Sequence, residues 1–393
     1  MSPDITKHLE GSMSVRKRKW FTRNGEPKEA WIVDYTDGQG NRHIETFERK
    51  KDADARHAAV TVEVERGIHT AKGRSITLAA AAEDWIRFVS LEKREPATIA
   101  GYRQHVDKHI VPRLGASKLA TLTTPRIERF RDDLLESMSR ALTKKVLGSL
   151  KSILKDAKRR GNVAQNVAAD VKVDMSGRKP RLQVGKDIPT RDEVRRMIDA
   201  GPPSRGRTLI MVAAFSGLRA SELRGLRWQD VDLKRGVLHV RQRADRYNTI
   251  GQPKSHSSER DLPIGPMVVN TLRQWKLASP KSAADLVFPT GKGTVDNHSN
   301  IVQRVLKPAQ IAARVVTKDG KPKYPGLHAL RHFYASWCIN RRQDGGLELP
   351  PKMVQARVGH ASIMITLDRY GHLFPSHDDG AELAEAERAV FAT

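Results

Sequence analysis

The feature that most constrains this chain is its surplus of positive charge. Across 393 residues, 70 lysines and arginines stand against 45 aspartates and glutamates, which leaves a net charge of +25. Such a surplus repels itself within a compact fold unless an anionic partner balances it, and nucleic acid is the usual partner. The sequence contains no evident basic amphipathic anchor, so a membrane surface fits less well. A merely basic globular protein is the remaining alternative.

Length and composition otherwise predict an ordinary globular chain of two or three domains. Hydrophobic residues make up 38% and charged residues 29%, and Cys338 is the only cysteine, so we expect a reducing compartment. No apolar stretch approaches the roughly 20 residues of a spanning helix. The polar residues 1–14 lack the apolar core of a signal peptide, and we interpret them as a disordered or cloning-derived tail. The expected location is therefore the cytoplasm.

Residues 15–70 predict a small module of three strands and one helix. Residues 30–35 and 42–47 have the composition of strands and flank a turn rich in Gly and Asp, while residues 50–66 are helical in composition. The segment opens with a basic cluster that we take as a candidate DNA contact: Arg16, Lys17, Arg18 and Lys19.

Residues 75–172 predict a helical domain, because apolar residues recur at three-to-four spacing. Pro112 is expected to stop the second helix and Pro125 to start the third. For any single lysine a solvated helix face is the better interpretation, but the surplus over the whole domain favours a surface that follows DNA. The candidates for DNA contact are Lys144, Lys145, Lys151 and Lys155. Residues 173–188, interrupted by Gly and Pro, predict a linker.

Residues 189–375 predict a mixed domain in which helices surround a β-hairpin. Gly217 is expected to break one helix, which places Arg219 at the join with the next, and Glu222 can hold the Arg219 guanidinium from three residues away. Lys254 is expected on an exposed turn or strand edge of the hairpin. Taken singly, a surface ion pair and a solvated lysine are the better interpretations.

Two further stretches of this domain carry candidate site residues. His328 and Arg331 project from one edge of a helix whose other face is apolar, and the neighbouring His332 is expected to be structural. His360 follows the end of a helix, and Tyr370 ends the next one. A single tyrosine near the end of a chain is more often a packing residue than a catalytic one.

The order of these residues is more specific than any one of them. The series Arg219, Lys254, His328, Arg331, His360 and Tyr370 resembles the active-site series of the tyrosine recombinases, the family of phage integrases. The surrounding motifs Gly-Leu-Arg-x-Ser-Glu-Leu, His-x-Leu-Arg-His, Gly-His and Tyr-Gly-His also stand in the family's order. The resemblance covers about residues 185–375 closely. Residues 75–172 look like the family's core-site binding domain, and residues 15–70 like the arm-site modules of some integrases.

The resemblance implies a mainly α fold with small β elements: a three-stranded sheet plus helix, a helical core-binding domain and a mixed catalytic domain. Tyr370 would attack phosphorus and form a phosphotyrosine, while two guanidinium forks, Arg219 and Arg331, suit the phosphate oxygens. The resemblance further implies one role for each remaining residue: leaving-group acid for Lys254, proton transfer at Tyr370 for His328, phosphate hydrogen bonding for His360, and orientation of Arg219 for Glu222. No metal-binding or phosphate-loop motif stands in the sequence, so no metal or cofactor is expected.

Residues 376–393 turn acidic and predict an amphipathic tail helix. In similar recombinases such a tail docks on a neighbouring protomer and gives a tetramer on two DNA duplexes, and folding back on its own domain is an equal alternative. The expected partners are double-stranded DNA attachment sites of a mobile element, with a possible directionality factor.

Three other functions compete with integration or excision of a mobile element. A type IB-like topoisomerase would use the same chemistry, but two N-terminal modules sized for separate DNA sites favour recombination. An Xer-type resolvase would usually lack the first module. A non-enzymatic DNA-binding regulator would form no covalent adduct with DNA.

Overall fold

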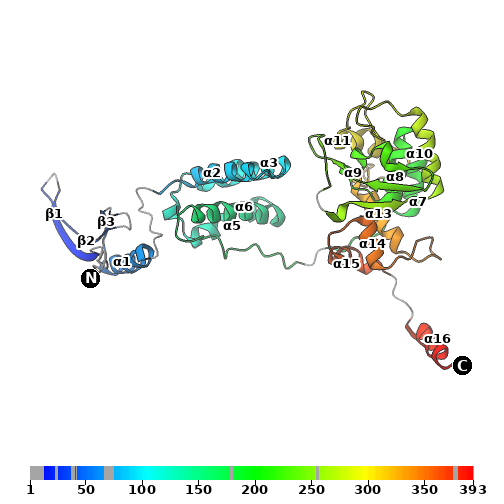
Figure 1. Cartoon of the computed structure of the whole chain (residues 1–393). Helices are drawn as coiled ribbons and strands as arrows, with labels where there is room; N and C mark the ends of the chain where they lie inside the picture. The colour runs from blue at the N-terminus through cyan, green and yellow to red at the C-terminus, as the bar shows by residue number, and fades with distance from the viewer. Residues whose placement is uncertain are drawn as a thin grey trace, which may run out of the picture. The chain divides into compact units, whose positions relative to one another are not determined.

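The computed structural model describes residues 13–22, 25–36, 40, 42–65, 75–177, 180–253, 256–374 and 379–392. Of the expected tail, residues 1–14, the first twelve lie outside the described residues, and so does Lys254. The chain divides into two compact units, Met1–Gly177 and Arg178–Thr393, and Figure 1 shows their elements in order along the chain. The N-terminal unit contains two separately packed parts, which we call the N-terminal module (residues 13–65) and the helical domain (residues 75–177).

The N-terminal module is a three-stranded antiparallel sheet with one helix. The sheet has the order β1-β2-β3, with β1 at Ser14–Phe21, β2 at Pro27–Thr36 and β3 at Arg42–Phe47. Helix α1 (Lys50–Glu65) packs on the sheet. Their small core contains Val33, Tyr35, Ala53 and Val60. The predicted three strands and one helix are therefore confirmed, and most of the turn between β2 and β3 lies outside the described residues.

The helical domain forms around one hydrophobic core. Its helices are α2 (Leu78–Leu91), α3 (Pro96–His105), α4 (Val111–Leu114), α5 (Thr124–Ser137) and α6 (Arg140–Arg159), with a 3-10 turn at Leu119–Thr121. The side chains of Thr77 and Ser139 cap α2 and α6. Largely apolar faces meet inside, where Leu78, Ile127 and Leu150 are fully buried.

The prediction that Pro112 stops a helix is wrong. A π-helical turn, Val106–Ile110, links α3 to α4, and the helix continues through Pro112 to Leu114. A proline lacks the N–H that an α-helix needs and crowds the preceding turn, but a π-helical turn shifts the hydrogen-bond pattern just before it. The proline therefore falls at the first positions of α4, where helices tolerate it.

The C-terminal unit consists mainly of helices. They are α7 (Arg191–Asp199), α8 (Arg205–Ser216), α9 (Ala220–Gly225), α10 (Pro266–Ala278), α11 (His298–Ile301), α12 (Lys307–Ala312), α13 (His328–Ile339), α14 (Pro351–Val358), α15 (Ile363–Tyr370) and α16 (Asp379–Phe391). A second π-helical turn spans Val302–Leu306, and 3-10 turns span Trp228–Asp230, His256–Ser258 and Gly371–Leu373. The predicted capping box of Thr190 and Glu193 at the start of α7 is confirmed.

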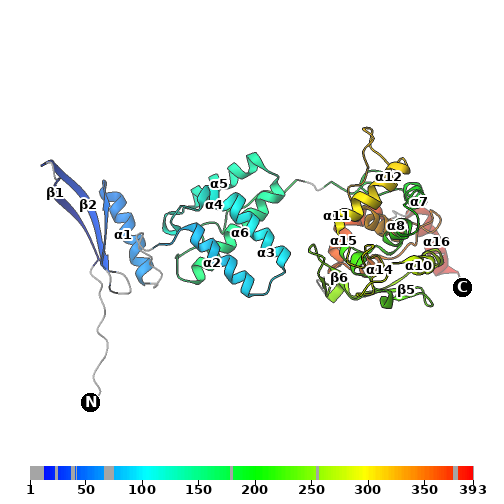
Figure 2. The same ribbon diagram turned by 90° about the horizontal axis from the view of Figure 1, so that it is seen from above.

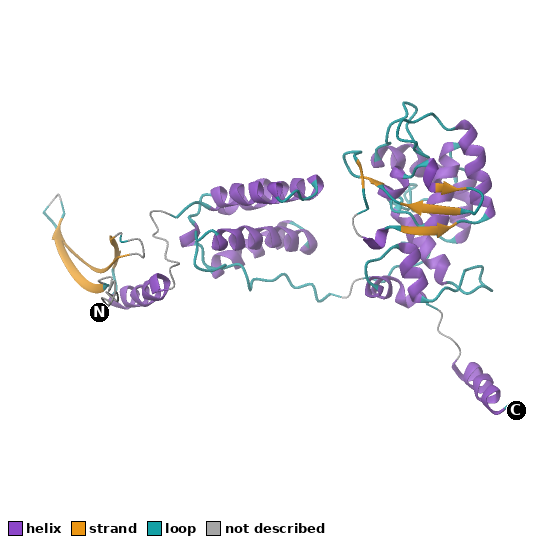
Figure 3. Ribbon diagram, viewed as in Figure 1, coloured by secondary structure: helices purple, strands orange, loops and turns teal. Residues whose placement is uncertain are grey.

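Two small sheets accompany these helices. One has the order β4-β5-β8, with β4 at Val231–Asp232, β5 at Val237–Val240 and β8 at Arg260–Pro263, and the other pairs β6 (Arg243–Ala244) with β7 (Ile250–Gly251). The expected pairing of the two longer hairpin strands is present as β5 with β8. Figure 3 shows helices as the bulk of this unit and of the helical domain, so the predicted mainly α class with small β elements is confirmed.

The core of the C-terminal unit surrounds α8. This helix is apolar almost all round, as a central helix should be, and it packs against α7, α10 and α13. A second cluster joins α13, α14 and α15 and includes Tyr334, Cys338, Val354, Val358 and Tyr370. Figure 2 shows α14 beside α15. The candidate residues on α13 and α15, and His360 just after α14, are therefore held by packed helices rather than by long loops.

Candidate active site

The position of Arg219 follows from a forced turn after α8. Gly217 has a left-handed backbone with φ of 61°, and a Cβ atom on it would lie 2.2 Å from the ring of Tyr334. Only glycine fits such a position, because other residues are strained at this φ and would clash with the ring. The helix therefore ends as predicted, and Arg219 becomes the N-cap residue of α9.

Glu222 binds Arg219 twice. Its Oε1 atom accepts a hydrogen bond from Arg219 Nη1 at 2.7 Å, and its Oε2 atom accepts one from the backbone N–H of Arg219 at 2.9 Å. Glu222 is 3% exposed, whereas the side chain of Arg219 is 34% exposed. The carboxylate is thus buried and orients a guanidinium that still reaches the surface.

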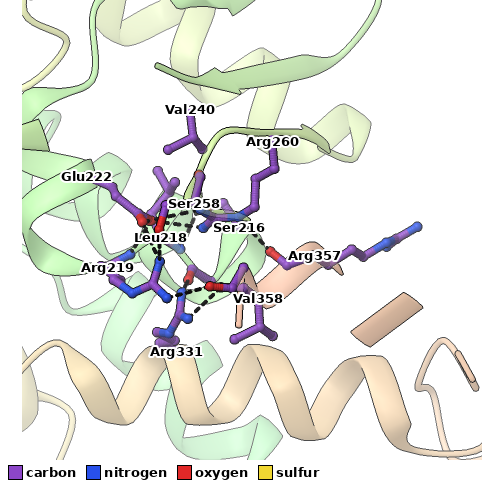
Figure 4. Close-up of polar contacts among 12 residues, drawn as sticks. Ser216, Leu218, Arg219, Glu222, Val240, Ser258, Arg260, Arg331, Arg357 and Val358 are labelled. Atoms are coloured by element: carbon purple, nitrogen blue, oxygen red, sulfur yellow. Dashed lines mark hydrogen bonds and ion pairs between the residues drawn. The ribbon is translucent and has the colours of Figure 1, made fainter. Parts of the chain in front are cut away.

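A second arginine, Arg260 on β8, binds the other side of Glu222. Its Nη1 and Nη2 atoms donate to Glu222 Oε1 at 3.2 Å and Oε2 at 2.9 Å (Figure 4). Burial raises the pKa of Glu222, but the charges of Arg260 and Arg219 outweigh it, so the pKa is lowered overall. Glu222 is therefore an ionised carboxylate between two guanidinium groups.

Arg331 on α13 is almost completely buried, with 2% of its surface exposed. Its Nη1 atom donates to Gly217 O at 2.5 Å, and its Nη2 atom donates to Val358 O. Burial and the charge of Arg219 lower the pKa of Arg331 to about 9, which leaves the guanidinium protonated at neutral pH. The same turn that positions Arg219 therefore also accepts a hydrogen bond from Arg331.

The C-terminal end of α14 accepts hydrogen bonds from all three guanidinium groups. Three consecutive carbonyls each accept a hydrogen bond from a different arginine: Arg357 O from Arg260 at 2.9 Å, Val358 O from Arg331, and Gly359 O from Arg219 at 2.6 Å. The last carbonyls of a helix lack partners within it and carry partial negative charge, so they attract cations. This helix end orients the arginines relative to one another and to His360, which follows it directly.

Tyr370 ends α15 and is 1% exposed. Its hydroxyl lies 2.7 Å from Nδ1 of His332, and the His360 ring lies parallel to the Tyr370 ring at 6.2 Å. Burial raises the pKa of Tyr370 to about 12, although the charges of Arg331 and Arg369 act in the opposite direction. The phenol is therefore protonated at rest.

The three histidines near Tyr370 are neutral. Burial, together with neighbouring positive charge, lowers the pKa of His332 to about 3 and that of His360 to about 4. His360 Nδ1 lies 2.9 Å from the hydroxyl of the fully buried Thr366. His328 is exposed overall, yet desolvation of its ring and the charge of Arg331 lower its pKa to about 4. The neutral His332 therefore shares a hydrogen bond with the phenol of Tyr370.

Most of the predicted site residues come together, and two of the residues found beside them were not predicted. The residues that the fold gathers are Arg219, Glu222, His328, Arg331, His360 and Tyr370. Lys254 lies outside the described residues. His332 was expected to be structural, but it is the direct partner of the Tyr370 hydroxyl. Arg260 was not considered, although strand alternation places it on the same face as the buried Leu262.

All of the predicted DNA-contacting residues except Lys151 are exposed. Arg16, Lys17, Arg18 and Lys19 alternate between the two faces of β1, so they do not form one patch. Lys17 pairs with Glu29 at 2.6 Å. On α6, Lys144, Lys145 and Lys155 are exposed, while Lys151 is half-buried and donates to Ala169 O at 2.8 Å.

The described part of the chain shows no cluster of three or more His, Cys, Asp or Glu side chains that could hold a metal ion. Among the same residues, no helix is both long and apolar enough to cross a membrane.

Known proteins are similar to this chain in sequence. Residues 189–377 match the model of the phage integrase family. The chain is 26% identical to a tyrosine recombinase XerC-like protein of Caldanaerobacter subterraneus over 93% of its length, covering 98% of that protein. It is 28% identical to tyrosine recombinase XerC of Yersinia pestis, over 77% of this chain and 93% of the relative.

Solved structures share the fold. The integrase of the Tn1549 transposon, in complex with a circular intermediate DNA, matches with a TM-score of 0.60 at 19% identity, over 80% of this chain and 100% of that one. A lambda integrase dimer bound to a COC' core site matches with a TM-score of 0.57 at 17% identity, over 92% of this chain and 97% of the other.

Together, the family match, the relatives and the fold define an enzyme that cleaves and rejoins DNA strands. Residues 189–377 belong to the phage integrase family, and the relatives of the chain in sequence are tyrosine recombinases, enzymes of site-specific recombination.

Proposed function

We propose that this chain integrates or excises a mobile element by cleaving DNA through a 3′-phosphotyrosine bond to Tyr370. The observation that carries the proposal is the convergence of Arg219, Arg331 and His360 at the end of α14, beside the ring of Tyr370. Two guanidinium groups can bind both non-bridging oxygens of one phosphate and stabilise charge in the transition state.

The chemistry needs help to ionise the phenol. A free tyrosine has a pKa of about 10, so about one molecule in a thousand is ionised at pH 7, a deficit of roughly 4 kcal/mol. Burial raises the pKa of Tyr370 further, to about 12. In the proposed step the Tyr370 oxygen bonds to phosphorus, the bond from phosphorus to the 5′ oxygen breaks, and Lys254 supplies the proton to that oxygen. His360 donates a hydrogen bond to the phosphate.

The phenolic proton leaves through the histidines of α13. We propose that His328 assists this transfer, with His332 as the group in direct contact, since the two rings lie edge to face at 4.5 Å. Replacing each histidine in turn by Gln tests the assignment. A loss of about a hundredfold in cleavage rate for His332→Gln, with a smaller loss for His328→Gln, supports the pair. A full rate for both variants contradicts it.

The proposed domains divide the DNA between them. Residues 15–70 bind an arm-type site, residues 75–172 bind the core site, residues 173–188 link them to the catalytic residues 189–375, and the protein acts in the cytoplasm. The proposed phosphate contacts are Arg16, Lys17, Arg18, Lys19, Lys144, Lys145, Lys151 and Lys155. All but Lys151 are exposed, as long-range attraction to a phosphate backbone requires.

The tail supports assembly of a tetramer on DNA. In α16 the apolar side chains of Leu383, Val390 and Phe391 are 60%, 78% and 82% exposed, and its charge is mainly acidic. Exposed apolar residues on an amphipathic helix call for a partner surface. A lambda integrase is known as a tetramer bound to a Holliday junction. Removal of residues 376–393 is expected to leave DNA binding intact and to abolish the tetrameric complex in sedimentation on DNA.

A plasmid assay tests the proposed function. Supercoiled plasmids with and without paired attachment sites, identified by sequencing covalently trapped DNA ends, are incubated with the protein and, if needed, a directionality factor. Recombinant product only with paired sites supports integration or excision. Relaxation without recombinant product favours a type IB-like topoisomerase, and exchange confined to chromosome-dimer sites favours an Xer-type resolvase.

A further inference from the structure

We propose that Arg260 is a positioning residue of the active site, which neutralises Glu222 so that Arg219 keeps its positive charge for the DNA phosphate. The inference rests on the proposed role of Arg219 as a phosphate ligand. It adds to that function a residue that never touches the DNA.

The geometry around Arg260 is that of a built-in ion pair. The guanidinium binds both oxygens of Glu222, and its Nη1 atom also donates to Ser258 O at 2.9 Å. The side chain of Arg260 is 7% exposed and that of Glu222 is 3% exposed. The Nε, Nη1 and Nη2 atoms of Arg260 all donate to Glu222 or to backbone carbonyls, so its guanidinium is directed at Glu222 and the end of α14.

Charge balance explains why Glu222 needs this second partner. Glu222 pairs with Arg219 and with Arg260, so the three groups together keep one positive charge. Without Arg260, the buried carboxylate would be balanced by Arg219 alone. The pair of Glu222 and Arg219 would then have no net positive charge to attract a phosphate. Electrostatic interactions are strong at buried sites, so this loss would act directly on transition-state stabilisation.

Arg260 also fixes the turn that carries His360. Its Nε atom donates to Arg357 O at 2.9 Å, and a Cβ atom on Gly359 would lie 2.9 Å from its Nη1 atom. Gly359 has a positive φ of 70°, which glycine adopts without strain. The guanidinium therefore lies directly against the turn, and the missing side chain at Gly359 leaves room for it.

The test compares three variants in single-turnover cleavage of a nicked duplex selected by covalent trapping. Arg260→Gln is expected to slow cleavage by about tenfold to a hundredfold, somewhat less than the loss of a donor that contacts the phosphate. Glu222→Gln/Arg260→Gln removes the unbalanced carboxylate and is expected to recover at least about fivefold of that loss. Arg260→Lys keeps the charge and is expected to retain more activity than Arg260→Gln.

Arg195→Gln, which breaks an exposed ion pair with Asp192 on α7, is the matched control and is expected to cleave at the normal rate.

The recovery in the double variant is the readout that a purely structural role would not give. A double variant no faster than Arg260→Gln, with thermal unfolding like that of the unaltered protein, would overturn the proposal. If Arg260→Gln fails to fold, the double variant, which has no unpaired buried charge, and Arg260→Lys still decide the point by their rates. The variant Tyr370→Phe, tested in parallel, distinguishes a failure of the Arg260 proposal from a failure of the proposed function. If a covalent adduct still forms in Tyr370→Phe, the proposed function is contradicted independently of the results for the Arg260 variants.

Discussion

Positive charge is organised in opposite ways in the two units of this chain. In the C-terminal unit, Arg260 and Arg331 are buried, and backbone carbonyls together with Glu222 fix their directions. In the helical domain, Lys144 and Lys155 stand exposed on α6. One chain with one surplus of charge thus contains cations held in a fixed geometry and cations left in solvent.

This difference distinguishes cations that stabilise the transition state of the reaction from cations that attract DNA to the surface. A buried, oriented guanidinium acts on a transition state with little reorganisation, so its loss appears in a rate. An exposed lysine acts through a screened, long-range field, so its loss appears in affinity and in the salt dependence of binding. The comparison predicts that substitutions in the two units will move different measurements.

Substitution of Arg331 is expected to have the largest effect on rate. Arg331→Gln removes a proposed phosphate donor and leaves Gly217 O or Val358 O without its partner. We expect the single-turnover cleavage rate to fall by about a hundred- to a thousandfold, with little change in the salt dependence of DNA binding. Arg331→Lys is the conservative control and should lose less. If folded Arg331→Gln cleaves within a few-fold of the normal rate, the claim that this buried guanidinium acts on the rate is contradicted.

The exposed lysines provide the opposite test. Changing Lys144, Lys145 and Lys155 together to Gln should reduce the slope of log affinity against log salt by up to about 0.9 per lysine. The cleavage rate of the DNA-saturated enzyme should stay the same. Fluorescence anisotropy over a salt series measures the slope, and Lys276→Gln, on α10 beside Trp228, is a matched control. An unchanged slope would show that this face of α6 does not meet the phosphates.

Acid should weaken the C-terminal unit through His332. Burial lowers the pKa of His332 in the folded state to about 3, below the ordinary value near 6.5 for the unfolded chain. The unfolded state therefore binds a proton first, so the stability that this residue contributes is complete above about pH 6.5 and is lost as the pH falls toward 3. The loss is at most about 1.4 kcal/mol per pH unit in that window.

Hydrogen exchange of the whole protein at pH 7 and pH 5 measures this effect separately in the two units. Protection of α13 should fall at pH 5, and His332→Gln should flatten the change. Equal pH dependence in the protein and in the variant would contradict the assignment.

The smallest expected effect concerns Gly148, in the middle of the cationic face of α6. A Cβ atom at Gly148 would meet nothing within 4 Å, and the same is true of Gly101 in α3. Alanine at either position should therefore stabilise the folded protein by about 1 kcal/mol, because glycine is a poor helix former.

If DNA lies against this face of α6, Gly148→Ala should also weaken DNA binding. Chemical denaturation that shows Gly148→Ala to be destabilising would contradict the open environment.

Local patterns predicted the elements of the fold well. The break at Gly217, the capping box of Thr190 and Glu193 and the pairing of β5 with β8 each depend on residues close in sequence or on strand alternation. The helix through Pro112 escaped prediction because a π-helical turn, which has no sequence signature of its own here, precedes it.

The site was predictable only where a family pattern existed. Arg219, Arg331 and Tyr370 were found by their order along the chain. Arg260 pairs with Glu222 from 38 residues away, and His332 reaches Tyr370 over the same separation, so nothing local distinguished them from surface or core residues. The strand alternation that places Arg260 beside Leu262 was the available signal, but it does not reveal the partner.

The most direct test of the central claim is the identity of the residue that becomes attached to DNA. The whole protein is incubated with nicked duplexes of randomised sequence, in which release of a short strand traps the covalent intermediate, and the adduct is digested and mapped by mass spectrometry. The account predicts a single phosphate-linked peptide containing Tyr370 and no adduct in Tyr370→Phe. An adduct on another residue, or an adduct that survives in Tyr370→Phe, would contradict it.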